Sequence, residues 1–308
     1  MGYTLHDKLV VAVSSRALFN LEEENKVFEE KGLDEYYKYQ LENESKPLKK
    51  GTGYRLVKNL LNINQYFDTK ERQVEVIILS KNNAATSLRI TNAINELGLD
   101  IVRSGWTSGN SISNYLKAFK VDLFLSADDN DVLNAIESGV AAAKILHSND
   151  NVHNSLGEQV RIAFDGDSVL FSEESELIFK ENGLEAFIEH EKQNRDNPLK
   201  MGPFAKLLLV IASMQEKFPT EKSPIRTALV TARSAPTHER VIKTLNVWGV
   251  RIDESFFLGG SDKYEILEAF GADIFFDDQD THLTLSSKVV PSAKVLNKNI
   301  ISHENKQS

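Results

Sequence analysis

The chain contains no cysteine among its 308 residues. Disulfide bridges, a thiolate nucleophile and thiolate-rich zinc sites are therefore excluded. A chain that needs no disulfide fits the reducing cytosol, so a cytoplasmic location is expected.

Long apolar runs are missing as well. No run reaches the roughly 20 residues that a membrane-spanning helix needs. The first residues show no basic region followed by an apolar stretch. We therefore expect neither a membrane span nor a secretion signal.

Positive charge is scarce, since the formal net charge is −9. A surface that binds nucleic acid normally carries a basic stripe, so no nucleic-acid partner is expected. An anionic substrate would have to be met by a local metal ion or basic cluster, because the overall field of the protein repels it.

The sequence does contain an internal repeat, because its two halves align at a constant offset of 151 residues. The matching pairs include Gly32 and Gly183, Pro47 and Pro198, Gly51 and Gly202, Arg89 and Arg240, Gly98 and Gly249, and Asp122 and Asp273. A constant register over about ninety residues indicates an internal duplication. We predict a first domain at 1–149 and a second at 158–308, separated by the polar segment 150–157.

Both halves alternate short apolar runs with helical patterns, which predicts an α/β fold with a mostly parallel, Rossmann-like sheet. The expected strands are Leu9–Val13, Val74–Leu79, Val121–Leu125, Val160–Phe164, Thr227–Val230 and Asp273–Phe276. The stretch Glu137–Ala143 is expected to end the first half as a helix tail. Residues of about 172–224 carry no strand pattern and predict a helical cap over the carboxyl ends of the strands, where such sheets bind ligands.

Four polar motifs follow the strands of the second half. The first is Asp165-Gly166-Asp167, in which two carboxylates flank a glycine that permits a sharp turn. Two carboxylates this close favour a bound cation or a retained proton. A solvated turn is the alternative interpretation of this motif.

The second and third motifs could hold an anion. Thr231 and Arg233 end a buried strand, and a hydroxyl beside backbone N–H groups suits a phosphate, although it equally suits a helix cap. Lys263 follows Gly259-Gly260-Ser261-Asp262 at the start of a helix, where a cation is disfavoured. An interior anionic partner for Lys263 is therefore expected, with a surface lysine as the alternative.

The fourth motif is the carboxylate pair Asp277-Asp278 after a further strand. Hard oxygen ligands without cysteine or clustered histidine favour Mg²⁺ over zinc. A solvated turn is again the alternative interpretation.

The order of these motifs resembles the haloacid dehalogenase-like phosphohydrolase superfamily. The flanking stretches Phe164–Ser172, Leu229–Ala235 and Ile274–Gln279 look like those of the cytosolic type I 5′-nucleotidases, and so do stretches of the first half at 17–19, 39–42, 116–118 and 125–128. The resemblance covers roughly residues 8–295. It implies a Mg²⁺-dependent 5′-nucleotidase acting on nucleoside monophosphates.

The resemblance also implies a role for each motif. Asp165 would attack phosphorus and form an aspartyl-phosphate. Asp167 would protonate the leaving ribose oxygen and then deprotonate water. Thr231 and Lys263 would hold the transferring oxygens, and Arg233 would bind the substrate or support a residue that does.

The implied metal ligands come from the same motifs. Mg²⁺ would be held by the Asp165 carboxylate, the main-chain carbonyl of Asp167, and Asp277. Asp278 is expected in the first or second coordination shell, with Asp277 ranked before it as the direct ligand.

The first half lacks these acids at the matching positions. Ser14 stands at the position of Asp165, Arg16 at that of Asp167, Ile112 at that of Lys263 and Ser126 at that of Asp277. We therefore predict no independent phosphatase activity in residues 1–149.

Two polar loops of the first half, 80–83 and 107–111, lie at predicted strand ends. Asn82 and Asn110 are therefore predicted to contact the nucleoside of the substrate or an effector. The alternative is that this half serves only as a packing partner.

Three other functions compete with the nucleotidase. The first is a phosphatase of the same superfamily acting on another small phosphomonoester, the second is a catalytically silent nucleotide-binding protein, and the third is a dehalogenase. Asp167 and the Asp277-Asp278 pair favour phosphoryl chemistry over the last. The resemblance allows a nucleotide activator and a homo-oligomer.

Overall fold

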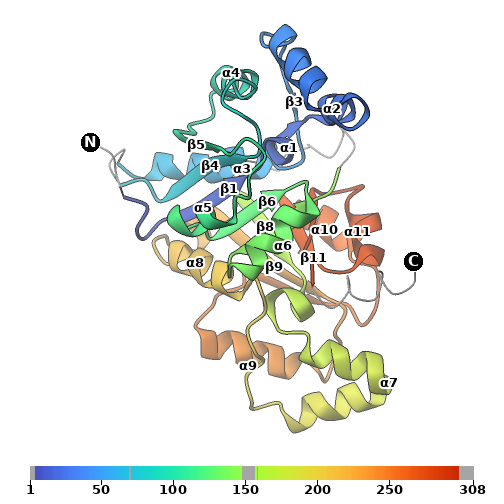
Figure 1. Cartoon of the computed structure of the whole chain (residues 1–308). Helices are drawn as coiled ribbons and strands as arrows, with labels where there is room; N and C mark the ends of the chain where they lie inside the picture. The colour runs from blue at the N-terminus through green and yellow to red at the C-terminus, as the bar shows by residue number, and fades with distance from the viewer. Residues whose placement is uncertain (1–3, 69–70, 148–156, 158, 298–308) are drawn as a thin grey trace. The chain divides into compact units, whose positions relative to one another are not determined.

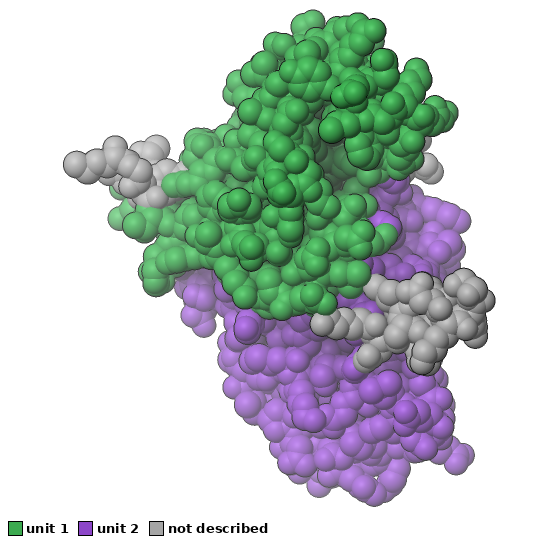
Figure 2. All heavy atoms as spheres, in the orientation of Figure 1, with its two compact units in different colours: residues 1–140 green, residues 141–308 purple. Residues whose placement is uncertain are grey.

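The computed structural model describes residues 4–68, 71–147, 157 and 159–297. The chain forms two compact units, Met1–Val140 and Ala141–Ser308 (Figure 2). The polar segment 150–157, predicted as the domain boundary, lies outside the described residues except for Gly157.

The first unit is built on a four-stranded parallel sheet (Figure 1). Its order is β6 (Leu123–Ser126), β1 (Leu9–Val13), β4 (Val74–Ser80) and β5 (Arg103–Trp106). All residues of β1, β4 and β6 are buried, as expected for strands that helices cover on both faces.

Helices connect these parallel strands, as a parallel sheet requires. They are α1 (Ser15–Leu18), α2 (Glu22–Glu42), α3 (Tyr54–Asn62), the 3₁₀ turn Ile63–Tyr66, α4 (Leu88–Glu96), α5 (Ser113–Ala118) and α6 (Asp129–Glu137). The short strands β2 (Phe19–Asn20) and β3 (Lys49–Lys50) pair beside α1 and α2.

The second unit is also built on a mainly parallel sheet. Its order is β10 (Glu254–Phe257), β9 (Ile225–Thr231), β8 (Val160–Phe164), β11 (Ile274–Asp277), β12 (Ser292–Lys294) and β7 (Ala141–Ile145). All neighbours are parallel except the antiparallel pair of β12 and β7. The predicted α/β class with a mostly parallel sheet is therefore confirmed.

The connections of the second unit are the turn Gly166–Leu170, α7 (Glu174–Gln193), α8 (Ala205–Gln215), the 3₁₀ turn Thr220–Lys222, α9 (His238–Trp248), α10 (Tyr264–Phe270) and α11 (Asp280–Ser286). Apolar side chains of the strands and helices, such as Val230, Phe275 and Leu267, form a buried core. Three of the polar motifs lie at the ends of the strands β8, β9 and β11. The remaining motif, Lys263, lies directly before helix α10, which follows β10.

The predicted helix tail at Glu137–Ala143 is wrong. Helix α6 ends at Glu137, and Ala141 begins strand β7. Gly139 has a φ of 83°, a conformation that ends a right-handed helix. The small residues that follow are buried in the strand, so tertiary packing overrides the high helix propensity of alanine.

The two units share one order of elements. Strands β1, β4, β5 and β6 recur 151 residues later as β8, β9, β10 and β11. The Asp122 carboxylate accepts a bond from the backbone N–H of Val10, and the matching Asp273 accepts one from Arg161. Glu75 pairs with Arg103, and the matching pair Arg226 and Glu254 has the charges exchanged.

One glycine kinks the long helix of each unit. Gly32 interrupts α2 with φ and ψ of 83° and −176°, and Gly183 interrupts α7 with 80° and −177°. This backbone region is essentially restricted to glycine. Each long helix is therefore a hairpin of two shorter helices.

Gly202 is packed against the turn that carries the first acidic motif. Its N–H donates to the Leu170 carbonyl at 2.8 Å, and a Cβ atom at this position would lie 2.6 Å from the Val169 carbonyl oxygen and against that of Phe171. A side chain therefore does not fit without moving backbone.

We predict that Gly202→Ala lowers the free energy of unfolding by about 1–3 kcal/mol, the usual cost of overpacking. Urea denaturation measures the change. Lys206→Ala, at an exposed position of α8, is the matched control and should change stability by less than about 0.5 kcal/mol. Equal stabilities of the two variants would contradict this account of the turn.

Candidate active site

Asp165 lies directly after β8, and its side chain is buried. Its backbone N–H donates to the Phe276 carbonyl at 2.8 Å, which ties it to the end of β11. Lys263 Nζ lies 2.7 Å from Asp165 Oδ1 and 2.7 Å from Asp277 Oδ2. Lys263 is only 2% exposed, so this lysine has the interior anionic partners that its position before α10 suggests.

Asp277 ends β11 and is fully buried. Its Oδ2 also lies 3.1 Å from His282 Nδ1, and its Oδ1 accepts the backbone N–H of Gln279 at 2.8 Å. Asp278 follows it at 3% exposure. Asp278 Oδ1 is buried and, among the described residues, has no hydrogen-bond partner.

The three carboxylates could hold a metal ion together. Asp165, Asp277 and Asp278 each offer an oxygen, and these oxygens lie within 4.8 Å of one another. The ammonium group of Lys263 contacts two of these three acids, and one oxygen of the third, Asp278, lacks a partner among the described residues, so the donor set fits a hard divalent cation. The acidic cluster predicted from two separate motifs is thus assembled at one place.

Burial shifts the titration of these acids. It raises the pKa of Asp165 to about 7, against the opposing effect of Lys263. It raises the pKa of Asp278 to about 9, and neighbouring carboxylates add to the shift. Burial alone would raise the pKa of Asp277, but Lys263 and His282 hold it below its ordinary value.

Asp167 does not join this cluster with its side chain. Its two carboxylate oxygens accept from Arg233 Nε at 2.8 Å and Nη2 at 2.6 Å. Arg233 Nη1 lies 2.5 Å from Glu191 Oε2, and Arg240 Nη1 lies 2.9 Å from Glu191 Oε1. A buried chain of alternating charge therefore connects Asp167 with helices α7 and α9.

Thr231 ends β9 beside the acidic turn and is 1% exposed. Its Oγ1 accepts from the backbone N–H of Arg233 at 3.3 Å. A Cβ atom on Gly166 would lie 3.3 Å from this hydroxyl oxygen. Glycine between the two aspartates thus lets the turn approach Thr231.

The two asparagines predicted as substrate ligands have different surroundings in the first unit. Asn82 lines a cavity and bonds to Ser15, Ser80 and Tyr36. Asn110 is exposed and donates to the carbonyl of Thr107 within its own loop, and it does not line that cavity.

Sequence reasoning missed Glu191. Although fully buried, it bonds to two arginines and to Ser175 Oγ at 2.8 Å. The repeat gives no signal for it, because Glu24, which pairs with Arg89 at 2.6 Å, matches Ser175 in the second half and not Glu191. Nothing in the local sequence around Glu191 marks it.

Comparisons with known proteins find 5′-nucleotidases. A family model described as 5′-nucleotidase matches residues 1–301. The human protein named cytosolic 5′-nucleotidase 1B is 38% identical over 284 residues, which cover 89% of this chain and 46% of that protein. The chain therefore spans about half the length of this curated relative. No solved structure gives a significant match.

Among the described residues, no helix is both long and apolar enough to cross a membrane.

The family model covers nearly the whole chain, including both units and all four polar motifs. Together with the human relative, it confirms the resemblance seen in the sequence: the chain belongs to the 5′-nucleotidase family, with its likeness to the cytosolic type I members.

Proposed function

We propose that this chain is a Mg²⁺-dependent 5′-nucleotidase that hydrolyses nucleoside 5′-monophosphates in the cytoplasm. The observation that carries the proposal is the contact of Lys263 with both Asp165 and Asp277, with Asp278 alongside. A carboxylate nucleophile needs neighbouring positive charge, because the phosphoryl group that it attacks is itself anionic.

The reaction would proceed in two displacements. Asp165 Oδ forms a bond to phosphorus while the bond to the ribose oxygen breaks, and Asp167, which has to enter this step in its protonated form, gives that oxygen its proton. Asp167 then takes a proton from water, whose oxygen attacks the aspartyl-phosphate and restores the Asp165 carboxylate. Thr231 and Lys263 hold the phosphoryl oxygens during both steps.

Mg²⁺ would neutralise charge on the phosphoryl oxygens and orient them. The Asp165 carboxylate, the main-chain carbonyl of Asp167 and the Asp277-Asp278 pair would hold it. Both oxygens of Asp277 already accept bonds, whereas Asp278 Oδ1 accepts none among the described residues. Asp278 therefore offers the more available oxygen of the pair.

Arg233 would govern the proton transfer. A carboxylate that accepts two bonds from a guanidinium is held in one orientation. Asp167 has to leave at least one of these bonds before it can protonate the ribose oxygen. Glu191 accepts a bond from the opposite side of the Arg233 guanidinium. It would therefore limit how far this guanidinium can move together with the Asp167 carboxylate.

We further propose that the two units descend from one duplicated haloacid dehalogenase-like domain, with α7 in the helical cap of about 172–224. The matched order of elements and the offset of 151 residues support this. Arg89 Nε donates to the backbone carbonyl of Lys46, and the matching Arg240 Nε donates to the backbone carbonyl of Asn197. The first unit kept the scaffold and lost the acids.

Phosphate release from a panel of nucleoside monophosphates and sugar phosphates tests the function. We expect release from nucleotides with Mg²⁺, none with chelator, and a loss of at least about 10³-fold in Asp165→Asn. Ser14→Ala, at the matching position of the first unit, is the control and should retain activity. Release from sugar phosphates alone would overturn the substrate, and release from nothing would favour a silent binding protein.

Metal binding can be tested without activity. At a Mg²⁺ concentration of about 100 times its Kd, the protein should gain about 2.7 kcal/mol of stability against unfolding. Asp278→Asn and Asp277→Asn should reduce this gain. Asp280→Asn, on the exposed start of α11, is the matched control and should keep it. An equal gain in all four proteins would place the cation elsewhere.

Glu191→Gln tests the buried chain of charges. It leaves two buried guanidinium groups without their shared anion, so the free energy of unfolding should fall by about 3–5 kcal/mol. The misplaced Arg233 should also lower kcat on the order of 10- to 100-fold. Glu189→Gln, exposed on the same helix, is the control, and a Glu191→Gln variant with unchanged stability and kcat would refute this role.

A further inference from the structure

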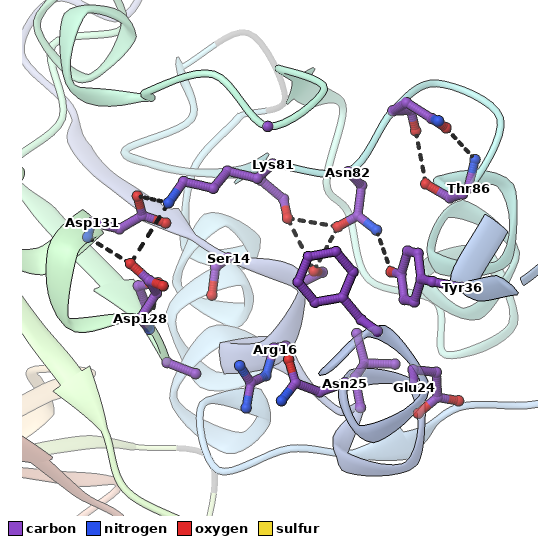
Figure 3. A pocket seen from close by; sticks show the side chains of 18 of the residues that line it. Ser14, Arg16, Glu24, Asn25, Tyr36, Lys81, Asn82, Thr86, Asp128 and Asp131 are labelled. Atoms are coloured by element: carbon purple, nitrogen blue, oxygen red, sulfur yellow. Dashed lines mark hydrogen bonds and ion pairs between the residues drawn. The ribbon is translucent and has the colours of Figure 1, made fainter. Parts of the chain in front are cut away.

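The first unit contains a cavity of about 490 Å³ at the carboxyl ends of β1, β4 and β6 (Figure 3). This is where parallel sheets bind ligands, and the volume lies within the usual range for small-molecule sites. The residues that would make this end hydrolytic are absent, since Ser14, Ser126 and Ile112 replace Asp165, Asp277 and Lys263.

One wall of the cavity is aromatic. Phe28 and Tyr36 lie on the two arms of the α2 hairpin, with ring centroids 5.8 Å apart and planes 79° apart. The matching pair of the second unit, Phe179 and Phe187, has nearly the same geometry, at 6.1 Å and 81°. A pair of rings at a cavity wall can take up a planar heteroaromatic group.

A second part of the lining is polar, and hydrogen bonds hold its side chains in place. Asn82 Oδ1 accepts from Ser80 Oγ at 2.7 Å and from Ser15 Oγ at 3.0 Å, and its Nδ2 donates to Tyr36 Oη at 2.8 Å. These bonds join Asn82 to the aromatic wall (Figure 3). Hydroxyl and amide groups of this kind suit a sugar and the edge of a base.

The charge of the cavity argues against an anionic ligand. Its ionisable lining residues are two cations, Arg16 and Lys81, and three anions, Glu24, Asp128 and Asp131. Both cations are already paired, Arg16 with Glu22 at 3.0 Å and Lys81 with Asp131 at 2.8 Å. Although Arg16 Nε has no hydrogen-bond partner among the described residues, carboxylates outnumber cations in the lining, and this disfavours a phosphate.

The exchange of residues between the units points the same way. Asn82 stands where the second unit has Arg233, and Tyr36 stands where it has Phe187. The contact of Arg233 with the Phe187 ring, at 5.2 Å to the centroid, is thus replaced by a neutral hydrogen bond. The aromatic pair is kept while the buried cation beside it is lost, and the cation gained at the position of Asp167, Arg16, is partly exposed and paired with Glu22.

We propose that this cavity binds an uncharged nucleoside, with the base against Phe28 and Tyr36 and the polar groups directed by Asn82. Binding here does not require the proposed nucleotidase activity. Only the interpretation of the ligand as a product of the reaction, held at a second site, rests on the proposed function.

Calorimetric titration of the full chain carrying Asp165→Asn tests the proposal. The probes are adenosine, guanosine, cytidine and uridine, each compared with its 5′-monophosphate. We expect at least one nucleoside to bind. Asn82→Leu should weaken the affinity for this nucleoside by about tenfold, because the hydrogen bonds of the amide are lost. Phe28→Ala should weaken the affinity by about three- to tenfold through lost stacking.

Asn134→Leu, on the exposed face of α6, is the matched control and should bind as tightly as the parent. The solvent-exposed Phe28 keeps the test valid if Asn82→Leu fails to fold. The proposal is overturned if no nucleoside binds, if neither variant weakens binding, or if the Asn82-dependent ligand is a monophosphate bound much more tightly than its nucleoside. Activity is measured separately, so nucleoside binding without phosphate release would refute the proposed function and leave this site standing.

Discussion

The second unit is organised around the ammonium group of Lys263. It compensates two buried carboxylates at 2.7 Å each, while a third, Asp278, lies beside them. Burying an uncompensated charge costs several kcal/mol, so the ends of β8 and β11 and the start of α10 have to meet at one place. The same crowding raises the pKa of Asp165 and Asp278, and a divalent cation bound between the carboxylates would relieve it. The contact of Lys263 with the two carboxylates is thus needed both for the stability of this end of the sheet and for the proposed chemistry.

The first unit has a similar sheet without these carboxylates and without the lysine. Ile112 is 1% exposed at the position of Lys263, and Ser126 is 1% exposed at that of Asp277. An apolar side chain is tolerated there because no carboxylate has to be compensated. The parallel sheet and its helices persist with the same order of elements. The fold of the first unit therefore forms without an acidic cluster at this end of its sheet.

Sequence patterns predicted the buried parallel strands and the acids that follow them, because continuous apolar runs and polar strand ends are local features. The alanine-rich strand β7 was taken for a helix, since its residues favour helices and only its burial in the sheet decides otherwise. Strands β2, β3 and β12 have only two or three residues, and the partly exposed strands β5 and β10 are not continuous apolar runs. Glu191 could not be found either, because its importance lies in contacts with Arg233 and Arg240, which are 42 and 49 residues away.

The kinked helices α2 and α7 explain how one scaffold can support two kinds of site. Gly32 and Gly183 give both hairpins the same bend, and each hairpin presents a pair of rings. In the second unit, α7 also places Glu191 beside Arg233 and so connects the hairpin to Asp167. In the first unit, α2 delivers the Tyr36 hydroxyl to the neutral Asn82. A few side chains on one bent helix and one strand end therefore distinguish the acidic cluster of the second unit from the cavity of the first, and neither requires a change in the sheet.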